Sequence, residues 1–260
     1  VLLNEMGNNR GIGFDPAFDG RLPEAANNRD LTFVADFYTE KQSGYRGDFF
    51  CCKMTLEHNP DTARFMGAIR RAIGNQHDTT VFFQIPNGAY VMRDLAFWDI
   101  YYEHCSYFSS GSLARLFRRI GFDVKHLTRA FSEQYLMLAA QPYHEDDARS
   151  EDEDDREKMA QLVRHFSENC GSKIARWREK LRKLNQKGSR VVLWGAGSKA
   201  VAFLTTLGIF QEIEYAVDVN PYRHNTYLAG TGQRIVAPEF LRGYRPDVVI
   251  VMNPIYQDEI

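Results

Sequence analysis

Apolar and polar positions alternate along the first half of the chain as expected for strands and helices that pack together. Behind Asn59 and Pro60, which have the character of a helix N-cap and a first helical residue, apolar positions recur at helical spacing up to Ile73. This predicted crossover helix separates the last two of four short apolar runs. We expect the four runs to be strands of a mostly parallel sheet, at Gly11–Asp15, Leu31–Phe37, Phe49–Met54 and Thr80–Pro86.

Two β-rich runs close this first region, at Val124–Phe131 and Gln134–Ala140. Only two residues separate these runs, which predicts an antiparallel hairpin. Between the fourth strand and the hairpin we expect a loop of about 25 residues that is rich in aromatic side chains. A helix over Ser112–Ile120, ended by Gly121, is predicted to follow that loop.

A long helical pattern follows an acidic stretch. Residues Glu145–Glu157 are mostly acidic, which predicts a solvated linker. Ser150 and Glu153 have the spacing of a capping box, and apolar residues then recur every three or four positions over Met159–Leu184. The pattern predicts one amphipathic helix, about 45 Å long at 1.5 Å per residue, whose apolar stripe is a packing surface rather than a cofactor site.

A second alternation of apolar runs and helical spacing begins at Arg190. It predicts a second α/β unit with strands at Arg190–Trp194, Ile213–Asp218 and Val248–Met252, a helix at Lys199–Leu207 and a short helix from Pro238. The chain is thus predicted to consist of a first domain over residues 1–144, a linker and helix over residues 145–188, and a second domain over residues 189–260.

Composition and charge argue against several classes of partner. The formal net charge is −2 and we find no basic stripe along the sequence, which argues against nucleic acid, because its phosphates are bound mainly by Lys and Arg. There is no stretch of about 18 apolar residues and no visible signal peptide, so we expect a cytoplasmic protein without a membrane span. The four cysteines form no C-x-x-C pair, so we expect reduced thiols and no metal site. The sequence does not indicate an oligomeric state.

An acidic residue follows the first predicted strand. In doubly wound folds a carboxylate at this place can accept hydrogen bonds from both hydroxyls of a ribose, which makes Asp15 a candidate nucleotide ligand. Asp15-Pro16 is also an ordinary turn sequence. The context of the other motifs favours the functional interpretation.

A Gly-rich turn opens the second unit. Gly195 and Gly197 would let backbone amides approach a phosphate, the helix N-terminus adds partial positive charge, and Lys199 adds a full charge. A tight strand-to-helix turn explains the glycines but neither Ser198 nor Lys199, so we favour phosphate or pyrophosphate binding. The last glycine of the G-x-G-x-x-G pattern is replaced, so NAD binding is not specifically indicated.

The richest chemistry lies in Trp98–Phe108, which holds a His, a Glu and several aromatic residues after the fourth strand. Some of these aromatics are expected to belong to the core, and a lone His is more often structural than catalytic. His58, however, follows the neighbouring strand, and the carboxyl ends of parallel strands share one edge of the sheet. We therefore expect His58, Tyr101 and His104 to meet in one pocket.

In six stretches of the chain, and in their order and spacing, the sequence resembles the sugar C-methyltransferases. This family includes enzymes methylating C3 of dTDP-linked 4-keto-deoxysugars. The resemblance covers nearly the whole chain. It implies a class I S-adenosylmethionine (SAM)-dependent methyltransferase sheet of the α/β class, a long linking helix, and a second Rossmann-like α/β domain that helps to hold a nucleotide-linked sugar. The stretches are Arg10–Pro16, Cys52–Pro60, Trp98–Phe108, Val192–Phe203, Val217–Pro221 and Met252–Ile260.

The resemblance also implies roles for individual residues. Asp15 would bind the ribose of SAM, and Asp36 and Phe37 would lie near its adenine, with Thr55 as a further cofactor contact. The residues expected around the sugar are His58, Tyr101, Glu103, His104 and Tyr107. Those expected to hold the nucleotide are Gly195, Gly197, Ser198 and Lys199, with Asn220, Asn253 and Tyr256 as weaker candidates.

Relative to the family, we expect this sequence to lack both ends. Family members begin with a small zinc-binding module, followed by a strand and a Gly-rich loop that cradles SAM. The first sheet is therefore expected to be incomplete at its N-terminus, and zinc is expected only in that missing module. Glu259-Ile260 lies where a family member would continue into a helix and a final strand.

As a mechanism, we expect a base to remove the proton next to the sugar's ketone, and the resulting enolate carbon to take the methyl group. His104 is the candidate base because imidazole titrates near neutral pH, and Glu103 would orient it. Tyr101 and His58 would hydrogen-bond the enolate oxygen. The alternatives are an NAD(P)-dependent oxidoreductase that uses the Gly195 turn, and a non-catalytic nucleotide-sugar-binding protein, which would not need the convergent side chains.

Overall fold

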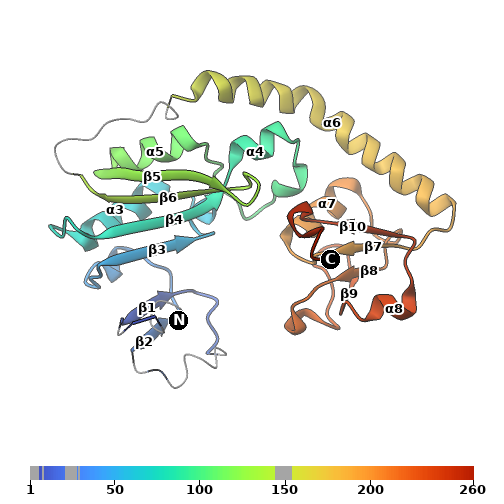
Figure 1. Cartoon of the computed structure of the whole chain (residues 1–260), viewed down its shortest axis with the longest axis horizontal. Coiled ribbons are helices and arrows are strands. Elements are labelled where there is room, and N and C mark those ends of the chain that lie inside the picture. Colours follow the sequence, from blue (N-terminus) through green and yellow to red (C-terminus); the bar gives the residue numbers. More distant parts are fainter. Residues whose placement is uncertain (1–5, 8, 21–27, 29, 144–153) are drawn as a thin grey trace.

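The computed structural model describes residues 6–7, 9–20, 28, 30–143 and 154–260. The chain forms two α/β units that are joined by one long helix, α6 (Arg156–Gln186), which runs along one side of the molecule (Figure 1). The predicted α/β class and the order of sheet, linking helix and second α/β unit are confirmed. The predicted domain bounds stay a prediction.

The main sheet of the first unit has four strands in the order β3-β4-β6-β5. Its first two strands are parallel, whereas β5 and β6 pair antiparallel, so the predicted hairpin is confirmed. The turn of this hairpin has three successive non-glycine residues with positive φ, Phe131, Ser132 and Glu133. The strands are β3 (Phe49–Lys53), β4 (Thr80–Pro86), β5 (Phe122–Ala130) and β6 (Tyr135–Pro142).

Three α-helices accompany this sheet among the described residues. The first begins after Asp61, whose carboxylate accepts the N–H of Arg64 at 3.0 Å, so the predicted N-cap Asn59 and first residue Pro60 are wrong by about half a turn. The long loop expected after β4 contains an unpredicted short helix, which Asn87 caps by accepting the N–H of Ala89. The helices are α3 (Thr62–Ile73), α4 (Gly88–Arg93) and α5 (Ser110–Arg119).

The core of the first unit combines side chains from the sheet, α3 and α5. Phe83 of β4 meets Phe117 of α5 edge-on, with ring centroids 5.0 Å apart, and neither ring has any exposed surface. Met66 and Ile73 of α3 belong to the same buried cluster. This packing fixes the ends of β3 and β4, and the loops with the candidate catalytic side chains extend from those ends.

The first two predicted strands do not join the main sheet, which corrects our expectation of one continuous sheet. β1 (Gly11–Phe14) and β2 (Leu31–Val34) pair parallel with each other in a separate sheet. Within the described residues, ring contacts connect this pair to the rest: Tyr38 lies 5.1 Å from Phe14 and 6.3 Å from Phe65 of α3. No described strand pairs with both sheets, so side-chain contacts hold the two together: these ring contacts and an ion pair of 2.7 Å between Glu40 and Arg71 of α3.

The apolar stripe of α6 is less buried than predicted. Of its 31 residues only Cys170 and Leu181 are buried among those described, and Val163 in its first half is 52% exposed. The second half packs on the second unit, where Trp177 meets Phe203 edge-on at 5.1 Å. No helix in the described ranges has both the length and the apolar composition needed to cross a bilayer.

The predicted capping box of Ser150 and Glu153 lies outside the described residues. The helix follows Asp155, whose carboxylate accepts the N–H of Gly111 at 2.8 Å and so joins the start of α6 to the start of α5.

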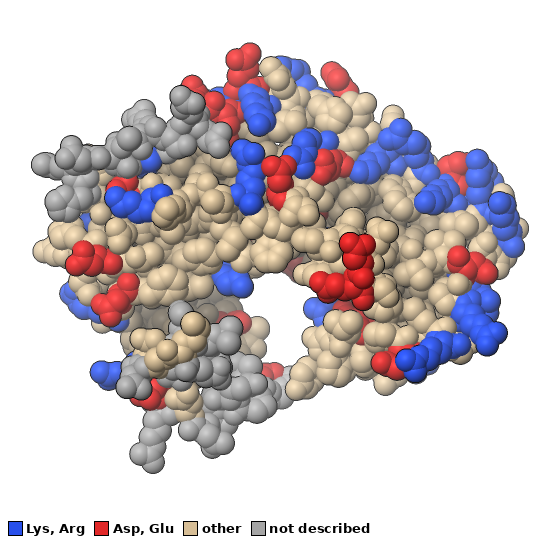
Figure 2. Space-filling view, viewed as in Figure 1, with Lys and Arg blue, Asp and Glu red and all other residues tan. Residues whose placement is uncertain are grey.

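Basic side chains gather over the second half of α6 (Figure 2). Residues 173–187 contain seven Lys and Arg, so our expectation of a sequence without a basic stripe is wrong for this segment. Two of them, Arg182 and Lys183, pair with Glu179 on the exposed surface. The expectation that the protein does not bind nucleic acid stays a prediction.

The second unit contains one parallel sheet in the order β10-β7-β8-β9. The strand β9 was not predicted, because its three residues lie inside a long polar segment. The main helix, α7, starts directly after the Gly-rich turn. The elements are β7 (Val191–Trp194), α7 (Ser198–Leu207), β8 (Tyr215–Val217), β9 (Arg234–Val236), α8 (Phe240–Tyr244) and β10 (Val248–Val251).

Candidate active site

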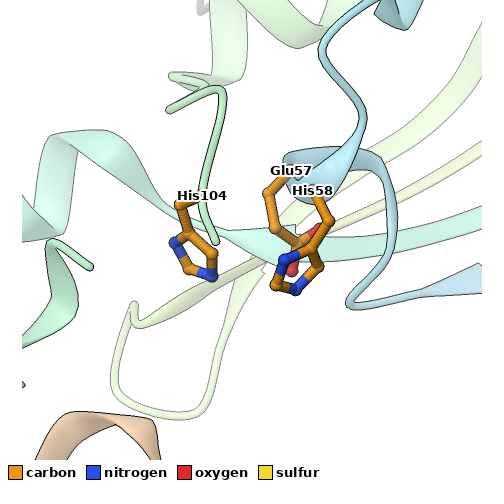
Figure 3. Close-up of side chains that lie close together, drawn as sticks. All are labelled: Glu57, His58 and His104. Atoms are coloured by element: carbon orange, nitrogen blue, oxygen red, sulfur yellow. The ribbon is translucent and has the colours of Figure 1, made fainter. Parts of the chain in front are cut away.

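Two loops of the first unit bring His58 and His104 together. His58 ends a single 3-10 turn (Leu56–His58) that follows β3, and His104 lies in the segment after a second 3-10 turn, η3 (Phe97–Asp99). Their ring centroids are 5.0 Å apart (Figure 3). The loops are joined through the backbone, since the carbonyl oxygen of Glu57 accepts the N–H of Cys105 at 2.7 Å. Sequence reasoning anticipated this meeting from the parallel strand ends. Of the three side chains expected in one pocket, however, Tyr101 lines the cleft between the two units, and His58 and His104 do not.

Glu57 is the site residue that sequence reasoning missed. The residue is 1% exposed, and within the described part of the chain neither of its carboxylate oxygens has a hydrogen-bond partner. The two ring nitrogens of His104, which is 9% exposed, are likewise without partners. One donor atom from each of Glu57, His58 and His104 lies within 4.8 Å of the others, and the three side chains converge in Figure 3. The only sequence signal for Glu57 was its position directly before His58.

The environment of these groups shifts their titration. Burial, and then the charges of His58 and Lys199, lower the pKa of His104 to about 4. His104 is therefore a neutral imidazole with a free lone pair at pH 7, and the premise that it titrates near neutral pH is wrong. Burial raises the pKa of the Glu57 carboxyl. Both shifts have the same physical cause, since loss of water penalises whichever form is charged.

Two tyrosines pack around His104. The ring centroid of Tyr101 is 4.1 Å from that of His104, and the centroid of Tyr107 is 5.5 Å away. Burial raises the pKa of Tyr101, so its phenol keeps its proton and remains a hydrogen-bond donor. The Tyr107 hydroxyl donates to the backbone oxygen of Asp99 at 3.3 Å, which closes the segment on itself.

Glu103 does not orient His104, in contrast to our expectation. Its side chain is exposed, and both nitrogens of His104 lack a partner among the described residues. Glu103 acts through its backbone carbonyl oxygen, which lies 3.0 Å from Nδ1 of His58. A carbonyl only accepts, so His58 carries its proton on Nδ1 and presents Nε2 as a lone pair. In this tautomer Nε2 accepts hydrogen bonds, which does not fit our prediction that His58 donates one to the enolate oxygen.

The residues predicted to hold SAM lie at strand ends. Asp15 follows β1, is exposed, and accepts the N–H of Ala17 at 2.8 Å. Asp36, shortly after β2, accepts the N–H of Phe37, whose ring is 67% exposed. An acidic side chain and an open aromatic ring beyond adjacent strands fit a ribose and an adenine. Thr55 is exposed after β3 and donates to the backbone oxygen of Lys53.

The Gly-rich turn of the second unit has the strained backbone that requires glycine. Gly195 has φ of +105° and its N–H donates to Val217 at 2.8 Å. The side chain of Asp218 accepts the N–H of Ala196 at 3.2 Å. Sequence reasoning missed Arg223, whose guanidinium donates to the carbonyl oxygen of Ala196 and lies 3.5 Å from Asp218.

We predicted that Lys199 binds a phosphate, but its ammonium group is occupied by other contacts. Its ammonium lies 2.9 Å from a carboxylate oxygen of Asp99 and 3.1 Å from the side-chain oxygen of Gln134, both in the first unit. Asn253 accepts a hydrogen bond from the Gln134 amide at 2.8 Å, so it too contacts the first unit. Asn220 caps a local turn by accepting the N–H of Tyr222.

A cleft of about 670 Å³ lies between the two units. Tyr101 and the exposed Tyr102 line one wall, and Gly197 and Ser198 at the start of α7 line the other. Arg223 contributes the positive charge of this cleft. Tyr256, which is 46% exposed, does not line it.

The cluster around His58 is also a candidate metal centre, which the sequence did not predict. Within the described ranges, Glu57, His58 and His104 are the one group of three or more side chains with the spacing to hold a metal ion. Two imidazoles and one carboxylate suit zinc or ferrous iron.

Each half of the chain matches a known family of domains. Residues 1–127 match the family described as "Methyltransferase domain", and residues 139–260 match "C-methyltransferase C-terminal domain". Among curated proteins, the C-methyltransferase NovU of Streptomyces niveus is 26% identical over 267 aligned positions, which cover 96% of this chain and 63% of NovU. The chain thus spans less than two thirds of the length of that relative.

The solved structures that resemble this chain are more distant in sequence. The dimethyltransferase RosA of Streptomyces davawensis shares 15% identity at a TM-score of 0.42, over 52% of this chain and 42% of RosA. The pyocyanin biosynthetic protein PhzM shares 17% identity at a TM-score of 0.40, over 52% of this chain and 43% of PhzM.

Proposed function

We propose that this chain, whose halves match a methyltransferase domain and a C-methyltransferase C-terminal domain, belongs to an enzyme that moves a methyl group from SAM to a carbon atom. The observation that carries the proposal is the cluster of Glu57, His58, Tyr101 and His104. It combines an unprotonated base, a protonated phenol and a buried carboxyl group. Such a set suits removal of a carbon-bound proton and stabilisation of the resulting enolate.

The substrate that we propose is a nucleotide-linked keto-deoxysugar. Support comes from the resemblance to the sugar C-methyltransferases and from the cleft, which has the catalytic tyrosine Tyr101 on one wall and the start of α7 on the other. The sugar ketone would lie near Tyr101, and the diphosphate near the amides at Gly197 and Ser198. Arg223 lies 3.5 Å from Asp218, but its side chain is 46% exposed and lines the cleft, whereas that of Lys199 is 21% exposed and does not. We therefore assign the diphosphate to Arg223 rather than to Lys199.

In the first step, the lone pair of His104 takes the proton next to the ketone. The carbon–hydrogen bond breaks, and its electrons form the enolate, whose charge lies mainly on oxygen. The Tyr101 hydroxyl donates a hydrogen bond to that oxygen, a type of contact worth about 2.7–4 kcal/mol at oxyanion holes. Tyr101 is suited to this role because its raised pKa keeps the phenol protonated.

Proton transfer makes His104 an imidazolium in a buried place. The Glu57 carboxylate beside it would then offset the charge, which assigns to Glu57 the role that we had predicted for Glu103. SAM, when bound, supplies an electrophilic methyl group to the enolate carbon. Asp15 would hold its ribose and Phe37 its adenine, and Asp36 would support Phe37 through the backbone.

Solvent exchange tests the proposal. In the full-length protein, His104→Asn should abolish both methylation and exchange of the sugar's α-proton with deuterium oxide, while the affinity for SAM stays that of the unchanged protein. Retained exchange would show that another residue is the base. Isothermal titration with SAM and with NAD(H) or NADP(H) separates the methyltransferase from an oxidoreductase, because only the expected cofactor should bind.

A further inference from the structure

The start of the candidate catalytic segment is docked into the second unit. Phe97 is 4% exposed and belongs to the hydrophobic core of that unit, although it is part of the first. Its ring stacks on Phe203 of α7, with centroids 5.8 Å apart and an interplanar angle of 15°. Trp98 meets the same Phe203 at 6.4 Å. The η3 turn is therefore packed against α7.

The polar end of this contact is an ion pair. The ammonium of Lys199 lies 2.9 Å and 3.1 Å from the two carboxylate oxygens of Asp99. The side chains are only 21% and 11% exposed, so solvent screens the attraction far less than at the surface. The side-chain oxygen of Gln134 accepts a third hydrogen bond from Lys199, and the Gln134 amide group donates a hydrogen bond to Asn253. The network joins β10, α7 and the hairpin turn to η3.

Asp99 holds both ends of the segment that carries the candidate catalytic side chains. Tyr101 follows it by two residues, and the Tyr107 hydroxyl returns to the Asp99 carbonyl oxygen. Lys199, in turn, directly follows Ser198, which lines the cleft. One ion pair thus connects the wall where a nucleotide would bind with the loop where chemistry would occur.

We propose that Lys199 is a positioning residue, which through Asp99 fixes the Tyr101–His104 segment against α7. This inference rests on the proposed function for its catalytic consequence. Lys199 does not bind phosphate, because a carboxylate within 3.1 Å already neutralises its charge and would repel an anion. Its task is to keep the candidate base and phenol at a constant distance from the substrate held at the start of α7.

The test compares three single variants of the full-length protein: Lys199→Met, Asp99→Asn and Lys183→Met. Lys183 is the matched control, since it is paired 3.3 Å from Glu179 but is exposed on α6. Lys199→Met and Asp99→Asn should each lower the turnover number for α-proton exchange by about 100-fold, the cost of misplacing reacting groups by about 1 Å. The dissociation constants for uridine and thymidine diphosphate should stay within about threefold. Lys183→Met should change neither quantity.

A second measurement does not depend on activity. Amide hydrogen–deuterium exchange over residues 100–107 should become faster in Lys199→Met and Asp99→Asn, while α3 exchanges at its usual rate. Lys199→Arg keeps the charge and should restore most of the protection. If the protein proves not to be a methyltransferase, faster exchange in this segment still supports the positioning role.

Two results would overturn the inference. In the first, Lys199→Met weakens nucleoside diphosphate binding more than about tenfold while residues 100–107 stay protected, which makes Lys199 a ligand. In the second, the Lys199 and Asp99 variants exchange over residues 100–107 as slowly as Lys183→Met. The ion pair would then be a static contact without influence on the segment.

Discussion

The phenol ring of Tyr101 lies 4.1 Å from the imidazole ring of His104, and both come from the one segment that is docked on the second unit. This places a proton donor beside a proton acceptor, each with its pKa shifted away from neutral by burial. In the mechanism that we propose, neither group would have to change its protonation state before the reaction begins.

Removing the Tyr101 hydroxyl should weaken enolate stabilisation. We expect Tyr101→Phe to lower the rate of α-proton exchange by about 10²–10³-fold, as for the loss of one oxyanion-hole donor, with little change in substrate affinity. The measurement is deuterium incorporation by mass spectrometry. Tyr143→Phe is the matched control, because Tyr143 is 53% exposed and does not line the cleft. Equal losses in both variants would contradict the role of Tyr101.

The lowered pKa of His104 should be visible in stability. The folded protein keeps His104 neutral down to about pH 4, whereas the unfolded chain protonates it near its ordinary value of 6.5. The unfolded state thus binds more protons between these values, and the contribution of His104 to the free energy of unfolding falls as pH drops from 6.5 to 4. Urea unfolding at about pH 7 and pH 5 should show a smaller loss in His104→Asn than in the unchanged protein. The same loss in both would rule out His104 as the source.

Glu57 and Glu103 form a natural pair for mutation, since one is buried and the other exposed. We expect Glu57→Gln to lower α-proton exchange by about 100-fold or more, because it removes the charge that offsets the imidazolium. Stability should stay equal or rise, since the neutral amide is cheaper to bury than a carboxylate without partners. Glu103→Gln should leave both properties unchanged. Exchange rates and urea unfolding of the two variants check this, and a larger effect of Glu103→Gln would restore our first assignment.

Transition metals should compete with the proton at this cluster. Because Glu57, His58 and His104 have the spacing of metal ligands, added Zn²⁺ is expected to inhibit α-proton exchange by occupying the lone pairs that the reaction needs. A brief treatment with EDTA should reverse the inhibition. Activation by Zn²⁺, or loss of exchange with EDTA alone, would show that the cluster works as a metal centre instead.

The turn before α7 should tolerate only glycine at its first position. Gly195 has φ of +105°, so Gly195→Ala is expected to cost about 1–3 kcal/mol of unfolding free energy. An added Cβ would also meet the Met252 side chain at 3.4 Å. Thermal unfolding measures the effect. Gly243→Ala in α8, where nothing lies within 4 Å of the added carbon, should be neutral or slightly stabilising.

The meeting of His58 and His104 could be predicted because strand order alone determines it. Two parallel neighbouring strands end at one edge, so the loops after them must lie together. Glu57 could not be found in this way. It is adjacent to His58 in sequence, and only the backbone of one 3-10 turn decides that its carboxylate points inward while His58 is exposed.

The partner of Lys199 was beyond sequence reasoning for a different reason. A Gly-rich turn before a helix predicts an anion site from local structure, and that reasoning contains no information about the other unit. Asp99 reaches Lys199 only because Phe97 and Trp98 insert their rings against α7. The separate β1–β2 sheet was likewise not predictable, since apolar runs indicate strands but not which edges pair.

The single unbroken helix α6 sets the rotational phase between the two units. Each residue added to a helix turns the rest of the chain by about 100° and advances it by about 1.5 Å. One inserted residue near the middle of its 31 would therefore swing Lys199 away from Asp99, whereas seven would nearly recover the angle yet displace it by about 10 Å. The length of the helix thus fixes both the angle and the distance between the two units. Insertions or deletions in it should therefore disturb the Lys199–Asp99 contact far more than substitutions on its exposed face.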